Sequence, residues 1–190
     1  MSNCTIVIDT ETTGLPPKGV PTQCLSKWDG CRIVQIAWQL HDSDGKLVAA
    51  RSWIVNPSGD CVFSPGAVNI HGISKERAQA EGVDIRVVWQ ALMDDLRVTN
   101  KLVAHNMSFD DSVITTEIMR MGDMELLKEW GSKERHCTML MGTERGKRWP
   151  KLMALYERTI GPIGEEVQSR LHDARTDVSL CADIYFRMCS

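Results

Sequence analysis

A short apolar run that ends in acidic residues constrains the fold of this chain more than any other feature. The segment IVIDTETTGL begins with Ile6, Val7 and Ile8 and continues directly into Asp9 and Glu11. Consecutive β-branched residues are typical of a buried strand at the centre of a sheet. Because residues i and i+2 of a strand face the same way, both carboxylates are expected on one side of its end.

Two carboxylates held this close repel each other, and one of them would normally take up a proton. A divalent cation removes the conflict, because hard cations such as Mg²⁺ prefer carboxylate oxygens as ligands. A D-x-E pattern alone is a weak signal, so two exposed carboxylates at a strand end remain the simpler interpretation at this point.

The following segments predict a mixed sheet with helices on its faces. Asp44-Gly45 is a strong turn signal between two runs rich in β-branched and aromatic residues, and it predicts a hairpin. The expected strands cover 5–9, 33–40, 47–55 and 102–104, and a long loop covers 14–30. The fold class is therefore α/β, with one domain over 1–190.

Helix boundaries are marked by residues that favour helix ends. Ser74 and Asp84 are suited to cap two helices after the hairpin, and Gly122 is expected to end a helix that starts near residue 108. Pro150 is expected to begin a helix that Gly161 ends, and a last helix is expected over about 173–188.

Composition excludes several classes of protein. The formal net charge of -3 provides no basic field of the kind that marks many nucleic-acid binders. Seven scattered cysteines form no disulfide framework, and a zinc site from Cys61, His136 and Cys137 lacks paired ligand spacing. Without a signal peptide or a long apolar run, we expect a soluble, cytoplasmic protein with no membrane contact.

Two later segments add further acidic residues. In VAHNMSFDD, Asp110 lies in the first turn of the expected helix, where an ordinary helix-end acid is the simpler interpretation. In HDARTD, His172 and Asp177 lie around the start of the last helix. A histidine beside a fourth carboxylate is a candidate for proton transfer.

Together these segments resemble the DEDDh group of 3′-to-5′ exonucleases, which includes the DnaQ-like proofreading subunits of polymerases. DTETTGL matches the first motif of the group, HNMSFD the second and HDARTD the third, in the family's order. AVNIHGISKE, over 67–76, is similar to a segment common between the first two motifs. The family pattern places the acid directly after Phe109, so Asp110 is chosen over Asp111.

The resemblance implies a ribonuclease H-like fold with a five-stranded mixed sheet whose first three strands are antiparallel. It implies that Asp9, Glu11, Asp110 and Asp177 bind two divalent cations, Mg²⁺ or Mn²⁺, and that His172 is the general base. The expected reaction releases nucleoside 5′-monophosphates from the 3′ end of single-stranded DNA or RNA, with DNA favoured.

The resemblance also suggests substrate contacts for three residues. Leu15 would wedge against the terminal base, Thr12 would lie near the 3′ hydroxyl, and Asn106 would orient the second motif or contact the terminal nucleotide. Each could instead serve loop packing. Trp28 is a weaker candidate for stacking on a base, and His71 and His105 are as readily explained by hydrogen bonds to the backbone.

The basic stretch over 145–151 is interpreted first as a solvated loop, with contact to a phosphate backbone as the alternative. Three other functions remain open for the chain as a whole. They are an exonuclease that acts on RNA, a non-catalytic module that binds a polymerase or replication partner, and an endonuclease or phosphatase with a similar carboxylate cluster.

Overall fold

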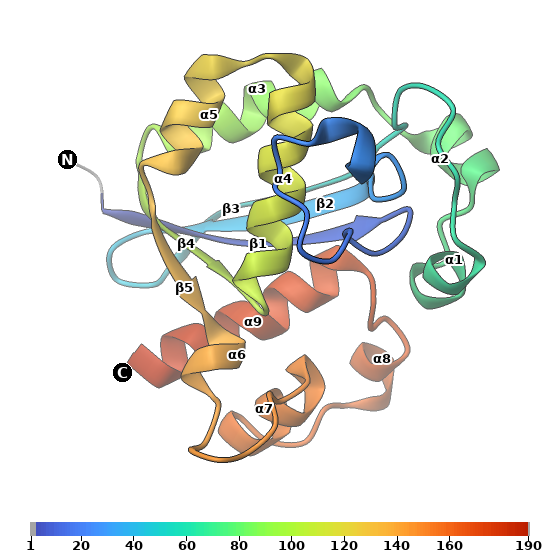
Figure 1. The fold of residues 1–190 in the computed structure, drawn as a ribbon. Helices are drawn as coiled ribbons and strands as arrows, with labels where there is room; N and C mark the ends of the chain where they lie inside the picture. The colour runs from blue at the N-terminus through green and yellow to red at the C-terminus, as the bar shows by residue number, and fades with distance from the viewer. Residues whose placement is uncertain (1–2, 190) are drawn as a thin grey trace.

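The computed structural model describes residues 3–189, except for the side chain at 166, and places a sheet between two groups of helices (Figure 1). Its five strands lie in the order β3-β2-β1-β4-β5. β1 pairs with β2 and β2 with β3 in antiparallel fashion, whereas β4 is parallel to both β1 and β5. The strands are β1 (Cys4–Thr12), β2 (Ile33–His41), β3 (Leu47–Ile54), β4 (Thr99–Ala104) and β5 (Glu134–Cys137). The predicted five-stranded mixed sheet is confirmed.

Helices cover both faces of this sheet (Figure 1). On one face lie α3 (Ile85–Leu96), α4 (Met107–Met121) and α5 (Met124–Gly131), and on the other lie α6 (Thr138–Met141), α7 (Leu152–Thr159) and α9 (Ala174–Cys189). The remaining helices are the 3₁₀ helix η1 (Leu25–Trp28), α1 (Pro65–His71), α2 (Lys75–Glu81) and α8 (Glu165–Gln168). No helix within the described residues is long and apolar enough to cross a membrane.

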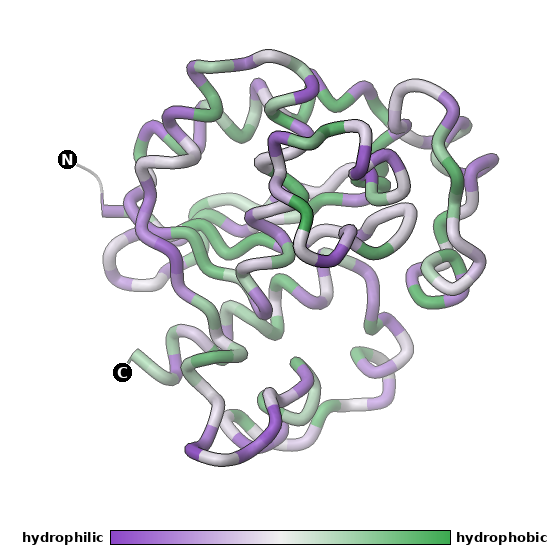
Figure 2. Tube along the Cα trace, in the orientation of Figure 1, coloured by the Kyte–Doolittle hydropathy of each residue, from purple (hydrophilic) through white to green (hydrophobic). Residues whose placement is uncertain are grey.

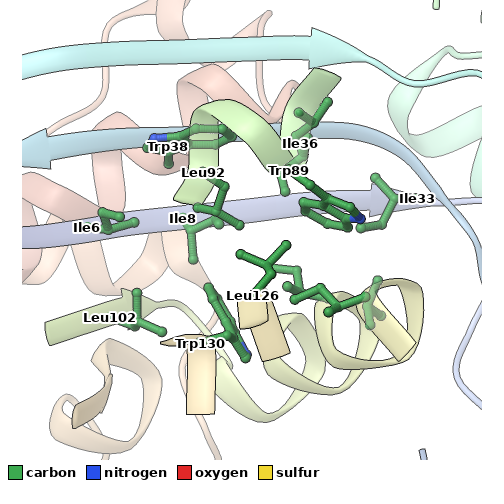
Figure 3. Close-up of a cluster of buried hydrophobic side chains, with 14 of the residues drawn as sticks. Ile6, Ile8, Ile33, Ile36, Trp38, Trp89, Leu92, Leu102, Leu126 and Trp130 are labelled. Atoms are coloured by element: carbon green, nitrogen blue, oxygen red, sulfur yellow. The ribbon is translucent and has the colours of Figure 1, made fainter. Parts of the chain in front are cut away.

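Strand β1 is buried on both faces, as the apolar run predicts. Ile6 and Ile8 join the larger core with α3, α4 and α5, which Figure 3 shows around Trp89, Leu92 and Trp130. Val7 instead packs against α9 in a second core. The apolar residues of both cores gather at the centre of the molecule, and polar residues occupy most of the outer loops (Figure 2). By the alternation of strand side chains, Asp9 and Glu11 share the α9 face with Val7.

Three of the sequence signals for helix ends, Ser74, Asp84 and Gly122, are confirmed. The side chains of Ser74 and Asp84 accept hydrogen bonds from the backbone N–H groups of Arg77 and Arg86. Gly122 ends α4 with a φ of 68°, a left-handed conformation that favours glycine. Side chains that cap free N–H groups therefore fix the helix starts locally.

The structure differs from the predicted elements in several places. β1 continues to Thr12 rather than ending at Asp9, so the acidic residues lie within the strand. The loop over 14–30 contains η1, and α7 starts at Leu152 rather than at Pro150. The sequence analysis did not locate four elements, α5, α6, α8 and β5. The sequence of β5, ERHC, lacks the alternation that is typical of a strand.

Candidate active site

The first motif lies on β1 opposite the central part of β2. Asp9 faces Ala37 and Glu11 faces Gln35 across the antiparallel pair. A break in the register follows directly, between Glu11 and Thr12, where the chain leaves the sheet. Both carboxylates therefore sit on a rigid strand at the edge where the chain turns into the following loop.

Asp110 approaches the same strand from the first turn of α4. Its side chain is buried, and Oδ1 accepts hydrogen bonds from the backbone N–H of Thr10 at 2.9 Å and from the Thr10 hydroxyl at 2.8 Å. Burial raises the pKa of Asp110 to about 7, and the bonds from Thr10 oppose that rise. Thr10 therefore holds Asp110 close enough to Asp9 and Glu11 to raise the pKa of both.

The third motif is held at the start of α9 by Gln35. The Gln35 amide nitrogen donates to Asp173 Oδ1 at 3.2 Å, and its oxygen accepts from the backbone N–H of Ala174 at 3.1 Å. Gln35 lies opposite Glu11 in the sheet, so this pair of bonds aligns the helix with the first motif. His172 precedes the helix with a positive φ of 65°. The sequence analysis missed Gln35, whose signal was a polar residue within the apolar first half of β2.

The helix and the strand bring acidic and basic side chains together. One ligand atom from each of Glu11, His172 and Asp177 lies within 4.8 Å of the others. Oδ1 of Asp177 is buried and has no hydrogen-bond partner among the described residues. An orphaned carboxylate oxygen that points into an acidic cluster is suited to accept a cation.

Burial and mutual repulsion raise the pKa values of the clustered acids. For Asp9, burial comes first, followed by the charges of Asp110, Asp177 and Glu11, and they hold its pKa well above the usual range. Burial, with Asp177 next, raises the pKa of Glu11 to about 8. Burial also raises the pKa of Asp177 to about 6, although His172 opposes the shift. At neutral pH the cluster therefore either keeps protons on some of its carboxylates, Asp9 and Glu11 first, or requires cations.

Comparison with known proteins identifies the family. The family model described as Exonuclease matches residues 6–185, almost the whole chain. The chain belongs to the exonuclease family. DNA polymerase III subunit epsilon of Rickettsia conorii is 28% identical over 191 residues, which cover 96% of this chain and 72% of that protein. The same subunit from Rickettsia felis is also 28% identical, with the same coverage of both chains.

Solved structures of Escherichia coli exonuclease I share the fold of this exonuclease. A complex with a dT13 oligonucleotide matches with a TM-score of 0.73 and 22% identity, over 96% of this chain and 40% of that one. A complex with a dA16 oligonucleotide matches with a TM-score of 0.72 and 20% identity, over 97% and 40%. The chain thus spans about 40% of the length of these structures. Together with the family match, they confirm a DnaQ-like DEDDh 3′-to-5′ exonuclease with a ribonuclease H-like fold.

The three predicted substrate residues of the exonuclease differ in exposure. Leu15 is 86% exposed beside the first motif. Thr12 is buried, and its hydroxyl donates to the carbonyl of Gly14 at 2.8 Å. Asn106 begins α4 in a left-handed conformation, and its side-chain oxygen accepts from the Ser108 hydroxyl. Leu15 is therefore free to meet a ligand, whereas the Thr12 hydroxyl is engaged within its own turn.

Two histidines of the exonuclease serve the backbone, as the sequence analysis allowed. Nδ1 of His71 accepts from the backbone N–H of Ile73, so Nε2 donates to the carbonyl of Thr12 at 3.1 Å. Nε2 of His105 lies 3.1 Å from the carbonyl of Pro150. His71 thus ties helix α1 to the end of β1.

One weaker prediction for the exonuclease, base stacking by Trp28, is wrong. Trp28 does not offer its ring to a base, because it packs in the larger core and its indole N–H donates to the carbonyl of Pro21 at 3.2 Å. Cys61 lies beside the guanidinium of Arg32, and no zinc-type cluster forms from Cys61, His136 and Cys137 within residues 3–189. Asp111 accepts from the Trp130 indole, which agrees with the choice of Asp110 for the site.

A buried ion pair supports the first motif from outside the cluster. Nε and Nη2 of Arg32 donate to the two carboxylate oxygens of Glu117 on α4. The backbone N–H of Arg32 donates to the Thr13 hydroxyl at 3.0 Å, and its carbonyl accepts from the Thr13 N–H at 2.8 Å. The pair therefore fixes the segment that carries Leu15. No local pattern links residues 85 positions apart, so sequence analysis did not find it.

Proposed function

We propose that this exonuclease hydrolyses the terminal phosphodiester at the 3′ end of single-stranded DNA, with two divalent cations, Mg²⁺ or Mn²⁺, bound by Asp9, Glu11, Asp110 and Asp177. The observation that carries the proposal is the convergence of these four carboxylates beside His172. A non-catalytic binding module has no need for one buried and three half-buried carboxylates that repel one another.

The donor set fits divalent cations. All four proposed ligands are carboxylates, which suit Mg²⁺ and Mn²⁺ better than thiols or several imidazoles would. The unpartnered Oδ1 of Asp177 and the raised pKa of Glu11 both indicate a place where positive charge is needed. Oδ1 of Asp110 is already occupied by Thr10, so its other oxygen is the one available to a cation.

The chain's own residues divide the chemical work. Bound divalent cations lower the pKa of water and stabilise negative charge on phosphate oxygens. A ring nitrogen of His172 accepts the proton of the attacking water, from a position within 4.8 Å of Glu11 and Asp177 ligand atoms. Leu15 packs against the terminal base, while Asn106 and the turn at Thr12 position the terminal sugar. The product is a nucleoside 5′-monophosphate.

The similar proteins support the substrate and partner that we propose. The exonuclease I structures are complexes with DNA oligonucleotides, and the Rickettsia relatives are named as subunits of a DNA polymerase. We therefore place DNA before RNA as the substrate and propose a polymerase as a partner. RNA remains the alternative, since discrimination depends on contacts at the 2′ position.

A gel time course tests the proposal. 5′-labelled single-stranded DNA and RNA of equal sequence are incubated with Mg²⁺, with Mn²⁺ and with chelator, beside the variant Asp9→Ala. Metal-dependent ladders that shorten by single nucleotides, and that vanish in the variant, are expected. Internal fragments would instead indicate an endonuclease, and intact substrate in every lane would indicate a binding module.

A further inference from the structure

The loop between α6 and α7, residues 142–151, concentrates unpaired positive charge. Arg145, Lys147, Arg148 and Lys151 are all exposed, and none of them forms an ion pair with another described residue. The loop's acid, Glu144, is already paired with Arg158 at 2.8 Å. In Figure 2 this loop is strongly hydrophilic along the lower edge of the molecule. The loop thus presents about four uncompensated positive charges on a chain whose net charge is -3.

An exposed tryptophan lies within the same loop. Trp149 is 66% exposed, whereas Trp28, Trp38, Trp89 and Trp130 are at most 3% exposed and Trp53 stacks on Trp38. A single exposed apolar residue is ordinary, but an indole between unpaired cations has the composition of a surface that binds single-stranded nucleic acid. Such surfaces combine phosphate-binding cations with aromatic rings on which bases stack.

His105 anchors this loop to the second motif. Because a carbonyl only accepts hydrogen bonds, Nε2 of His105 donates to the carbonyl of Pro150, and Nδ1 accepts from the Thr138 hydroxyl at 3.0 Å. His105 directly precedes Asn106, which begins the helix that carries Asp110. The residue after Trp149 is therefore held against the strand end that leads into the proposed active site.

The loop also lies on the side of the sheet that the proposed active site faces. The α6–α7 loop and α9 lie on the same face of the sheet (Figure 1). Asp9 and Glu11 face that side as well, so a strand that leaves the site can meet the loop without crossing the sheet. The acidic cluster itself repels a polyanion, and a separate basic surface on the same face of the sheet compensates for that repulsion.

We propose that the α6–α7 loop binds the nucleotides on the 5′ side of the terminal one. Trp149 stacks on a base, and Arg145, Lys147, Arg148 and Lys151 hold phosphates. The inference rests on the proposed function, because the strand's direction is set by hydrolysis at the 3′ end. Neither stacking nor phosphate contact reads base identity, so binding is independent of sequence.

Binding measurements in chelator test the loop apart from catalysis. The affinity for a fluorescent single-stranded oligonucleotide of about 12 nucleotides, within the range of single-strand binding sites, is measured by anisotropy at low salt. Trp149→Ala is expected to weaken binding by about 5-fold or more, and Trp149→Phe to retain most of it. The double variant Lys147→Gln/Arg148→Gln is expected to reduce the slope of log K against log salt by about 0.7 for each phosphate that the loop no longer neutralises.

Matched controls come from α5, on the opposite face of the sheet. Met124 is 69% exposed and Lys128 is exposed without a partner among the described residues, so Met124→Ala and Lys128→Gln make similar changes elsewhere. Both controls are expected to bind as the wild type does. Equal affinities for the wild type and Trp149→Ala, including no detectable binding by either, would overturn the inference. Polyphosphate and anionic vesicles carry no bases. If either bound the protein and its affinity fell as much in Trp149→Ala as the affinity for the oligonucleotide does, base stacking by Trp149 would be overturned.

Kinetics separate this inference from the proposed function. The ratio of kcat/KM for the oligonucleotide to that for a dinucleotide is expected to fall about 5-fold or more in Trp149→Ala, because a dinucleotide is too short to extend far along the loop. An unchanged ratio with active enzyme would refute the loop's role alone. Failure of the wild type to hydrolyse either substrate would refute the proposed function, and the anisotropy result would still decide on the loop.

Discussion

Two sets of carboxylates in this molecule differ in whether a basic side chain neutralises them. Glu117 is matched by the guanidinium of Arg32, and Asp95 accepts from Arg51 at 2.7 Å and from the Trp38 indole at 2.8 Å. The acids around Asp9 have no arginine or lysine partner among the described residues, and their pKa values rise. Paired acids serve the fold, whereas the unpaired acids leave an excess of negative charge that the proposed cations would balance.

The largest expected effect concerns the histidine beside the unpaired acids. His172→Ala is expected to lower kcat by about 10²- to 10⁴-fold, the range typical of a lost general base. The rate is measured with saturating Mn²⁺ at several pH values. The variant His71→Ala, whose ring bonds only backbone groups, serves as a comparison for general disturbance of the site. Unchanged activity at neutral pH would remove His172 as the base.

The next effect concerns the carboxylate whose Oδ1 lacks a partner. Asp177→Asn is expected to lower kcat by about 10²- to 10³-fold, the size found when one group that stabilises transition-state charge is removed. The variant should remain folded, because the substitution also removes a repelled charge. Circular dichroism confirms folding, and calorimetry is expected to show weaker Mn²⁺ binding. Activity above about a tenth of the wild type would exclude Asp177 from the proposed ligands.

Substitutions in the paired carboxylates are expected to change the stability of the protein more than its activity. Arg32→Ala leaves Glu117 buried without its partner, which is expected to lower the free energy of unfolding by about 3–5 kcal/mol. Urea denaturation measures the change. In the double variant Arg32→Met/Glu117→Leu, most of the loss should be recovered. The exposed pair of Arg97 and Asp94 is the control, since Arg97→Ala should cost less than about 1 kcal/mol.

The smallest expected effect is a pH dependence of stability in chelator. Glu11, Asp110 and Asp177 have folded-state pKa values of about 8, 7 and 6, above the value of about 4 in the unfolded chain. The folded state therefore binds more protons, and these groups lower the stability as pH rises from about 4 to about 8. We expect the Tm in chelator to fall between pH 6 and pH 8, the range over which Glu11 and Asp110 release protons in the folded state.

One variant and the addition of metal distinguish the effect of the acidic cluster on Tm from that of other titrating groups. Asp9→Asn is expected to show a shallower fall in Tm over the same range, since it removes one of the repelling charges. Mg²⁺ or Mn²⁺ is expected to raise the Tm of the wild type more at pH 8 than at pH 6. If Mg²⁺ or Mn²⁺ raised the Tm of Asp9→Asn as much as that of the wild type, the result would contradict a cation site formed by the cluster.

Local signals in the sequence predicted much of this fold and indicated acids that lie close together in the structure. Ser74, Asp84 and Gly122 act on neighbouring backbone groups, so their effect can be predicted from a few adjacent residues. The three motifs indicated Asp9, Glu11, Asp110, Asp177 and His172, and the structure brings these residues together. Their roles in catalysis stay predictions.

The missed features depend on partners distant in the chain. Trp28 reads as a loop residue, and only the packing of η1 on the core buries it. Gln35 acquires its role from a helix 138 positions away, and Arg32 from a helix 85 positions away. β5 is a strand because Lys101 to Ala104 offer it a parallel partner, not because ERHC favours one.

The proposed site is built from three segments that are far apart in the sequence, so it is complete only late in the synthesis of the chain. β1 carries Asp9 and Glu11, α4 follows about a hundred residues later, and His172 and Asp177 arrive only with α9. A nascent chain synthesised up to α7 has two of the three motifs but neither the proposed base nor the fourth carboxylate. Since domains fold as units during synthesis, we expect nuclease activity only after α9 docks on the sheet, and a chain truncated before α9 is expected to lack it.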